Sequence, residues 1–549
     1  MQVSDLFRFR NREIRALHLT WIAFFITFYV WFNMAPLASS ILASSDWLTR
    51  DDIRLFAIAN VALTIPARII VGMALDKWGP RRVFSVLMVS MAIPTFFFAF
   101  GDSKEQLFVS RLVLSSVGAS FVVGIHMTAL WFKPRHIGFA EGFYAGWGNF
   151  GSAAAAMTIP TVALVLYGGD DGWRYAIATS GAIMAIYGVF YWFAITDGPT
   201  KDTHKKPRKA AALEVSSFRD LVLLVIFTVP LVGILSILVY RVQMMGYIDG
   251  FVASLCYGAI AVVVLYQVWL AIRVNVPILK KGVPKDDRYP FSSVAALNTT
   301  YFANFGAELA VVSMLPMFFQ ETWGLNPVTA GLIASAFAFV NLVARPMGGL
   351  VSDRMGNRRF VMLAYMMGIA IGFALMGLLN SSWPLIIAIA ITICCSFFVQ
   401  GAEGATFGII PSIKRRVTGQ IAGMAGAYGN VGAVFYLFIF MFVTPSQFFF
   451  IIATGAAVSW LVCYFWLKEP QGGFGEEYVL SSVDQAIAAE ARQKIEAEAE
   501  LAELFTGSEK VTLADRGSSL TLTARFKDLD DLRAALSRIG KRGKEQPAQ

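Results

Sequence analysis

The sequence predicts an all-α membrane protein: two similar six-helix bundles, two further membrane helices between them, and a small cytoplasmic α/β segment at the C-terminus. Three observations lead to this prediction. Hydrophobic residues make up 56% of the 549 residues and charged residues only 15%, whereas a soluble chain is about a quarter charged. About fourteen apolar stretches have the length that a bilayer core requires. Two sequence motifs also recur in the same order in each half of the chain.

The apolar stretches run from Arg15 to about Lys468, and the chain from Glu469 onward is polar. The first stretch is too long for a signal-peptide core and lacks a cleavage site, so we interpret it as a retained helix. Allowing a few residues of error at each end, the expected spans are roughly 15–42, 51–75, 83–101, 106–132, 139–167, 173–195, 218–240, 247–273, 291–319, 326–351, 359–379, 384–410, 418–443 and 447–467.

Lysine and arginine are concentrated in alternate loops between these stretches. By the positive-inside rule, this pattern places both termini in the cytoplasm and predicts a multi-pass protein of the plasma (inner) membrane. The formal net charge of +9 therefore reports topology and not a nucleic-acid partner. The basic loops lie at residues 77–82, 133–135, 205–209, 280–288, 354–359 and 414–416.

The internal repeat divides the chain. Residues 72–82 read Gly-Met-Ala-Leu-Asp-Lys-Trp-Gly-Pro-Arg-Arg, and residues 349–359 read Gly-Leu-Val-Ser-Asp-Arg-Met-Gly-Asn-Arg-Arg. In each half an arginine, Arg68 or Arg345, lies eight residues before the aspartate of this motif. A glycine–asparagine motif recurs further along each half. The predicted domains are an N-terminal bundle (1–195), an insert with two extra spans (196–290), a C-terminal bundle (291–468) and a cytoplasmic tail (469–549).

These motifs resemble the major facilitator superfamily. Within it, Ala145-Gly-Trp-Gly-Asn-Phe-Gly151 and Ala425-Gly-Ala-Tyr-Gly-Asn-Val-Gly432 resemble the paired signatures of the nitrate/nitrite porter family. Ala402-Glu-Gly-Ala-Thr-Phe-Gly408 is similar as well. The resemblance covers about residues 15–468, and the insert is similar to that of cyanobacterial members. It implies the major facilitator fold, no cofactor, monomeric function, and import of nitrate and nitrite by alternating access.

Arg68 and Arg345 are the first candidates for the binding site. Eight residues of helix place each one ~12 Å inside the cytoplasmic end of its span, near the middle of a ~30 Å core. A charge at that depth usually faces a water-filled cavity or a partner, so anion binding and a structural ion pair are the two interpretations. A guanidinium group can offer planar nitrate two parallel donors. The family resemblance assigns both arginines to the anion, and Pro66 and Pro346 beside them are expected to distort their helices.

Four further residues are substrate-binding candidates. Asn149 and Asn430 can donate to nitrate oxygens without adding charge, or they can tie neighbouring membrane helices together. The resemblance favours direct contact by Asn149 and a supporting role for Asn430. Tyr301 and Phe121 match substrate-contacting positions of the family, and aromatic walls would exclude water from the site.

An anion that enters a cell against an inside-negative potential must be driven, most simply by protons. Glu308 and Glu403 lie within apolar spans, and His126 lies on the fourth span. Each is a proton-coupling candidate if it titrates in its buried position, or else a neutral, hydrogen-bonded tie between helices. The surroundings of the two glutamates resemble proton-coupled members of the family more than nitrate/nitrite exchangers.

Cytoplasmic gating is assigned to the repeated motif, through Asp76 and Arg82 in one half and Asp353 and Arg359 in the other. In the tail, residues 482–505 predict an exposed helix and residues 520–526 alternate as a strand does. Residues 528–539 predict a second helix. The tail has no catalytic motif, so a regulatory partner and a trafficking role both remain open.

The alternatives are a nitrate/nitrite exchanger, a facilitator for another small anion, and a transporter-like sensor that signals through its tail. An enzyme is not expected, because the sequence shows no nucleophile–base set, phosphate loop or metal-ligand spacing.

Overall fold

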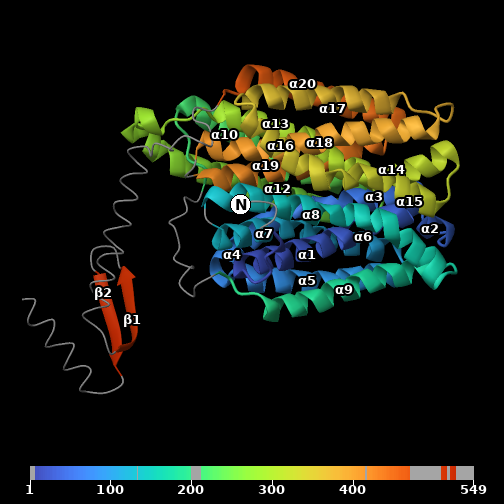
Figure 1. The fold of residues 1–549 in the computed structure, drawn as a ribbon, viewed down its shortest axis with the longest axis horizontal. Helices are drawn as coiled ribbons and strands as arrows, with labels where there is room; N and C mark the ends of the chain where they lie inside the picture. The colour runs from blue at the N-terminus through green and yellow to red at the C-terminus, as the bar shows by residue number, and fades with distance from the viewer. Residues whose placement is uncertain are drawn as a thin grey trace, which may run out of the picture. The chain divides into compact units, whose positions relative to one another are not determined.

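The computed structural model describes residues 6–132, 134–198, 212–414, 417–469, 508–515 and 520–526. In this part of the chain, 14 helical segments are long and apolar enough to cross a membrane, which confirms the expected number of spans. The chain forms two compact units, residues 1–283 with 289–476 and residues 284–288 with 477–549. The first unit contains the membrane helices (Figure 1).

The helices fall into three consecutive groups. The first half of the membrane unit contains α1 (Arg12–Phe32), η2 (Ala35–Leu37), α2 (Ala38–Ala43), α3 (Arg50–Ala62), α4 (Thr64–Trp78), α5 (Pro80–Ala99), α6 (Lys104–Leu114), η3 (Ser115–Ala119), α7 (Ser120–Trp131), α8 (Pro134–Thr161), η4 (Val162–Tyr167) and α9 (Gly172–Ala194). The insert contains α10 (Phe218–Gly233), α11 (Leu235–Met244), α12 (Gly250–Lys281) and η5 (Lys285–Asp287). The second half contains α13 (Phe291–Ala303), α14 (Phe305–Trp323), α15 (Pro327–Phe339), α16 (Asn341–Arg354), α17 (Arg358–Gly377), α18 (Leu385–Ile413), α19 (Thr418–Phe440) and α20 (Pro445–Trp466).

Several spans consist of more than one helical segment, and three of the breaks fall near a candidate site residue. The second span breaks at Leu63, between α3 and α4. Pro66 explains this break, because a proline has no N–H to donate and its ring clashes with the carbonyl four residues earlier. A second break falls at Asn304, whose side-chain oxygen accepts a hydrogen bond from the amide of Phe305 at 2.6 Å. The third falls at Val340, between α15 and α16. Discontinuous helices of this kind surround substrate sites in many transporters.

The two halves meet along two symmetric seams. In Figure 1 the helices α1 to α9, blue to teal, lie together, and the yellow to orange helices α13 to α20 lie on the other side. Across the boundary, α8 packs against α15 and α16, while α19 packs against α3 and α4. Each seam therefore joins a helix that carries a glycine–asparagine motif to the helix that carries the arginine of the opposite half.

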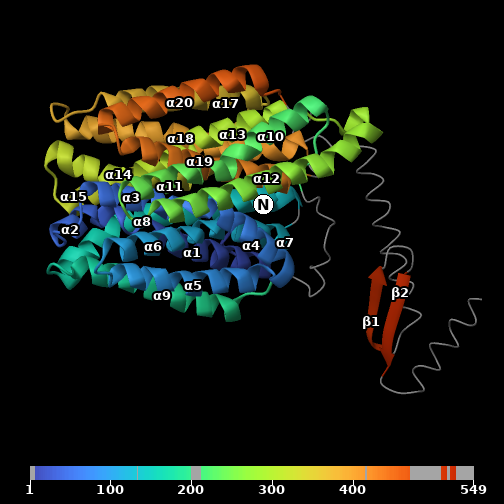
Figure 2. The same ribbon diagram turned by 180° about the vertical axis from the view of Figure 1, so that it is seen from behind.

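The insert lies against one of these seams. Figure 2 shows the green helices α10 to α12 running across the boundary of the two halves. Contacts join α11 to α3 and α19, and α10 to α4, α13 and α19. The hydroxyl of Tyr428 donates to the carbonyl of Phe227 at 2.6 Å. The outer helix α12 extends to Lys281 and not to about residue 273, because the mostly apolar residues 274–279 continue the helix up to the two lysines that end it.

Tyr247, in the turn after α11, anchors the insert to the first half. Its hydroxyl donates to Asp52 Oδ1 at 2.8 Å, and Lys104 contacts Oδ2 of the same carboxylate at 2.8 Å. Arg241 lies 3.6 Å from Asp51. Burial and the hydrogen bond to Asp52 both raise the pKa of Tyr247, so the hydroxyl keeps the proton that it donates at neutral pH.

We expect Tyr247→Phe to weaken the docking of the insert by about 1–2 kcal/mol, because a hydrogen bond to a charged acceptor is lost. The folded pKa is raised, so the contribution is fully present below the usual tyrosine range and is lost only at strongly alkaline pH. Thermal denaturation in detergent at neutral pH measures the change. An unaltered midpoint would show that Tyr247 does not hold the insert.

In the second unit, the described residues of the tail form β1 (Ser508–Asp515) and β2 (Leu520–Phe526). The strands pair antiparallel, with Val511 opposite Ala524 and Asp515 opposite Leu520. The strand β2 covers the residues 520–526 where the sequence pattern predicts a strand, and its partner β1 is a strand that the sequence pattern did not predict. The helices expected at 482–505 and 528–539 lie outside the described residues, so the α/β character of the tail stays a prediction.

Candidate functional site

The two arginines lie on equivalent broken spans, Arg68 on α4 and Arg345 on α16. Both side chains are buried, and the two guanidinium groups lie near enough for their charges to repel each other. The sequence-based expectation that both arginines converge on one central site therefore agrees with the geometry.

The two arginines differ in their partners. Arg345 Nη2 donates to the hydroxyl of Tyr301 at 2.8 Å, and Nη1 lies 2.8 Å from Glu403 Oε2. Among the described residues no carboxylate pairs with Arg68, whose Nε has no hydrogen-bond partner. Arg345 therefore forms the structural ion pair that was one of the two interpretations of these arginines. Arg68 is thus a buried cation that no carboxylate of the described residues neutralises.

A row of aromatic rings connects the two arginines. The guanidinium carbon of Arg68 lies 5.5 Å from the centroid of the Phe121 ring. Phe121 lies 5.9 Å from Phe407, which contacts Tyr301 edge-on at 5.2 Å. The predicted residues Phe121 and Tyr301 therefore belong to one wall. Phe407, which joins them, was missed, although it lies within the motif 402–408 that the sequence analysis singled out.

The asparagines have unequal hydrogen bonding. Asn149 on α8 is 1% exposed, and neither its side-chain oxygen nor its nitrogen has a partner. Asn430 on α19 donates to the carbonyl of Gly426 at 3.1 Å, and its oxygen has no partner. Asn298, one helical turn before Tyr301, is buried with both polar atoms unpaired and was not among the predicted site residues. Buried amides without partners are costly, and these groups have donors and acceptors that a polar ligand could satisfy.

Glycines of the repeated motif allow the close approach of the two halves. A Cβ added at Gly146 would lie 3.2 Å from the carbonyl oxygen of Asn341, at the start of the arginine helix of the second half. In the opposite direction, a Cβ at Gly426 would lie 2.9 Å from Nη1 of Arg68. Each motif therefore presents a bare backbone surface beside the arginine helix of the other half.

The two candidate glutamates lie together beside Arg345. Glu308 on α14 and Glu403 on α18 are both fully buried, and they lie near enough for their charges to interact. Glu403 Oε2 contacts Arg345 Nη1 at 2.8 Å. Asn341 Nδ2 donates to Glu308 Oε1 at 2.8 Å. His126, the third proton-coupling candidate, is half-buried on α7 in the other half of the molecule.

The gating candidates are described only in part. The side chains of Asp76 and Asp353 lie outside the described residues. Arg82 is exposed at the start of α5. The amide of Arg359 donates to Glu469 Oε2 at 2.8 Å.

Two acidic residues that the sequence analysis missed bind the loops of the repeated motif. Glu469 Oε1 also accepts the amide of Arg358, at 2.9 Å, and Asp197 accepts the amide of Arg81, at 2.7 Å. Each is the first acidic residue after the last helix of its half, which is the signal that would have identified them.

At the opposite ends of the helices, direct contacts join the halves. Arg50, at the start of α3, pairs with Glu321 of α14 at 2.7 Å. Arg54 donates to the carbonyl of Met441 at 3.3 Å and lies over the Phe440 ring at 4.9 Å. These contacts close this end of the seam in the structure.

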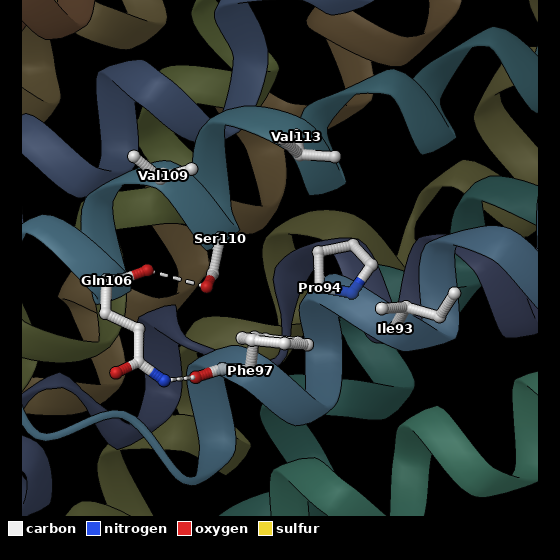
Figure 3. Close-up of a pocket in the computed structure, with 7 residues that line it drawn as sticks. All are labelled: Ile93, Pro94, Phe97, Gln106, Val109, Ser110 and Val113. Carbon is white, nitrogen blue, oxygen red and sulfur yellow. Dashed lines mark hydrogen bonds between the residues drawn. The ribbon is translucent and has the colours of Figure 1, made fainter.

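A surface groove between α5 and α6 is not the anion site. Figure 3 shows that its lining is largely apolar. Gln106 Nε2 donates to the carbonyl of Phe97 at 3.0 Å, and Ser110 Oγ donates to the carbonyl of Gln106 at 2.6 Å. The polar groups of the groove are thus already paired, and it has no charged residue.

One family profile and several known proteins are similar to this chain. The sequence profile of the Major Facilitator Superfamily matches residues 20–280 and 297–506. A protein of Picosynechococcus named nitrate/nitrite transporter NrtP is 43% identical over 508 residues, covering 85% of this chain and 95% of the relative. The protein of the same name in Nostoc punctiforme is 42% identical, covering 87% of this chain and 96% of the relative.

A more distant relative and a solved structure are also similar to this chain. The high affinity nitrate transporter 2.5 of Arabidopsis thaliana is 30% identical, covering 79% of this chain and 75% of the relative. Among solved structures, an inward open, partially occluded form of the xylose transporter XylE of E. coli has a TM-score of 0.56 at 13% identity. It covers 84% of this chain and 99% of that chain, a likeness of fold alone.

Proposed function

Because the chain belongs to the Major Facilitator Superfamily and, within it, to the nitrate/nitrite porter family, we propose that it imports nitrate and nitrite through the inner membrane. The members of this family are transporters and not enzymes. Nitrate binds between the two halves, at Arg68 and Arg345, and both termini lie in the cytoplasm as the basic loops predict.

The uncompensated charge of Arg68 is the observation that carries the proposal. Arg68 makes no hydrogen bond to the described residues, whereas the buried Arg111 donates to Asn33. A buried guanidinium group with neither a carboxylate nor a hydrogen-bond acceptor is unfavourable unless an anion neutralises it. Nitrate is planar, and two of its oxygens match two parallel N–H donors of one arginine. Asn149 supplies further donors without charge, and the aromatic row of Phe121, Phe407 and Tyr301 excludes water. These features support a small, planar, singly charged substrate.

The two seams between the halves support alternating access. The glycine surfaces at Gly146 and Gly426 let the halves slide and rock against each other around a fixed site. The contacts Arg50–Glu321 and Arg54–Met441 lie on the side that the charge pattern predicts to be outside, and their closure describes a site sealed from the exterior. Rocking in the other direction breaks these contacts, while the repeated motifs with Asp76 and Asp353 close the cytoplasmic side.

Proton coupling is assigned to the buried carboxyl pair. Two neighbouring buried carboxyl groups favour binding a proton, because two bare carboxylates repel each other. Glu308 and Glu403 therefore offer a protonation site directly beside an anion-binding arginine.

The domain boundaries, the monomeric state and a regulatory partner of the tail belong to the same proposal. Truncation after Glu469 tests the tail, whose loss should leave the rate of uptake per folded protein unchanged.

Nitrate uptake into proteoliposomes tests the function. We expect the purified chain to accumulate nitrate when an inward proton gradient is imposed, and less when the gradient is collapsed. Vesicles preloaded with nitrite and given no gradient measure exchange, which separates a symporter from a nitrate/nitrite exchanger. A folded preparation that moves chloride or an organic anion but not nitrate would overturn the substrate assignment.

A further inference from the structure

Glu403 stands where the anion is expected to bind. Its Oε2 lies 2.8 Å from Nη1 of Arg345, with both side chains buried. The contact does not have hydrogen-bond geometry, since neither Nη1 nor either carboxylate oxygen has a hydrogen-bond partner. The carboxylate thus neutralises the arginine without occupying its directional donors. An anion that makes two parallel hydrogen bonds to the same guanidinium group has a geometric advantage over it.

Glu308 lies on the other side of Glu403. It accepts a hydrogen bond from Asn341 through Oε1, and its Oε2 has no partner. The carbonyl oxygen of Asn341 also faces Gly146 across the seam between the halves. Asn341 is therefore a positioning residue that holds the carboxyl pair next to a contact that changes as the halves rock.

The surroundings of Glu403 contain few other titratable groups. Among the described residues of the elements around α18 these include Tyr301, Glu308, Arg345, Tyr365, Tyr428 and Tyr436, and Arg68 lies beyond Tyr301. Arg358 of α17 donates to the carbonyl of Gly408, five residues after Glu403. Tyr365 lies against Gly401, two residues before Glu403. The hydroxyl of Tyr428 donates to the carbonyl of Phe227 in the insert. The hydroxyl of Tyr436 faces Gly455 of α20. The charge of Glu403 is therefore set by Arg345 and Glu308.

We propose that the transported anion displaces Glu403 from Arg345 and that Glu403 then takes up a proton, so that anion and proton bind together. Without its cation, Glu403 would be a buried carboxylate beside a second carboxyl group, which is strongly unfavourable until a proton neutralises it. The proton comes from the aqueous side to which the site is open. When the anion leaves, Glu403 releases the proton and pairs with Arg345 again. This inference rests on the proposed function and gives its coupling step.

Proton uptake on nitrate binding is the direct test. Sodium nitrate is added to the purified full-length chain in weakly buffered detergent, with a pH indicator dye, and binding is followed separately by tryptophan fluorescence. We expect the wild type to take up about one proton per nitrate bound on the alkaline side of the transition. By linkage, the apparent affinity for nitrate should there fall about tenfold per pH unit. Sodium gluconate, too large for the site, should cause no uptake.

Variants separate the possible causes. Glu403→Gln should bind nitrate with an affinity that no longer depends on pH and should take up no proton, while Glu403→Asp should restore the uptake. Asn341→Ala should retain nitrate binding and shift the pH at which uptake occurs, which a merely structural role would not do. Glu105→Gln, at an exposed glutamate of α6, should match the wild type in every measurement.

Two results would overturn the inference while leaving the function intact: nitrate binding to the wild type without proton uptake, or full proton uptake by Glu403→Gln. A folded wild type that neither binds nor transports nitrate would overturn the proposed function and this inference together. Thermal denaturation of each variant establishes that the protein measured is folded.

Discussion

Replacing Arg68 with lysine is expected to reduce nitrate uptake roughly 100-fold while the protein remains folded. Lysine keeps the positive charge and cannot offer two parallel donors to a planar anion. A hydrogen bond between charged groups contributes about 1.5–3 kcal/mol, and each 1.4 kcal/mol corresponds to about a factor of ten in affinity. Gradient-driven uptake of labelled nitrate into proteoliposomes measures the loss. Arg345→Lys should cause a similar loss.

Arg111 provides the matched control for this substitution. It is another fully buried arginine of the first half, but its Nη2 donates to Asn33 Oδ1 at 2.8 Å and its guanidinium carbon lies 3.8 Å from the Phe98 ring centroid. Arg111→Lys should therefore lower thermal stability and leave the apparent affinity of the folded protein for nitrate unchanged. An equal loss of affinity in both variants would mean that Arg68 acts through packing and not through the anion.

The membrane spans could be predicted because their length is imposed by the bilayer and each lies between polar loops. The breaks within them were only partly predictable. Pro66 accounts for the break at Leu63, since its ring excludes the regular helix before it. Pro346 lies inside α16, and the break of that span falls at Val340 instead. The break at Asn304 depends on a local hydrogen bond that leaves no pattern in the apolar sequence.

The position of the two arginines could be predicted from their depth in the membrane and from the internal repeat. The eight-residue offset of Arg68 and Arg345 from their motifs placed both charges deep in the membrane, and both are buried. The pairing of Arg345 with Glu403 was not predictable, because it joins two helices that are distant in sequence. Phe407 could not be singled out by residue type among 46 phenylalanines. Only the packing of α7, α13 and α18 shows that it connects the two arginine sites.

Substituting alanine for Gly426 is expected to weaken nitrate binding about tenfold with little effect on stability. The added Cβ would lie 2.9 Å from Nη1 of Arg68, closer than a normal contact. The cost to the fold is small because the atom in contact is the end of a flexible side chain, which can turn away. The guanidinium group then leaves the position from which it meets the anion, and a loss of about 1.4 kcal/mol corresponds to that tenfold change.

Gly423→Ala is the matched control, on the same helix and one turn earlier. A Cβ at Gly423 meets nothing within 4 Å, so both variants gain the same helix propensity and only one displaces Arg68. We expect Gly423→Ala to bind nitrate as the wild type does, when both are titrated by tryptophan fluorescence and compared in thermal stability. Equal weakening in the two variants would indicate that α19 acts through its overall flexibility. A loss confined to Gly426→Ala would instead show that the glycine is required by the arginine of the opposite half.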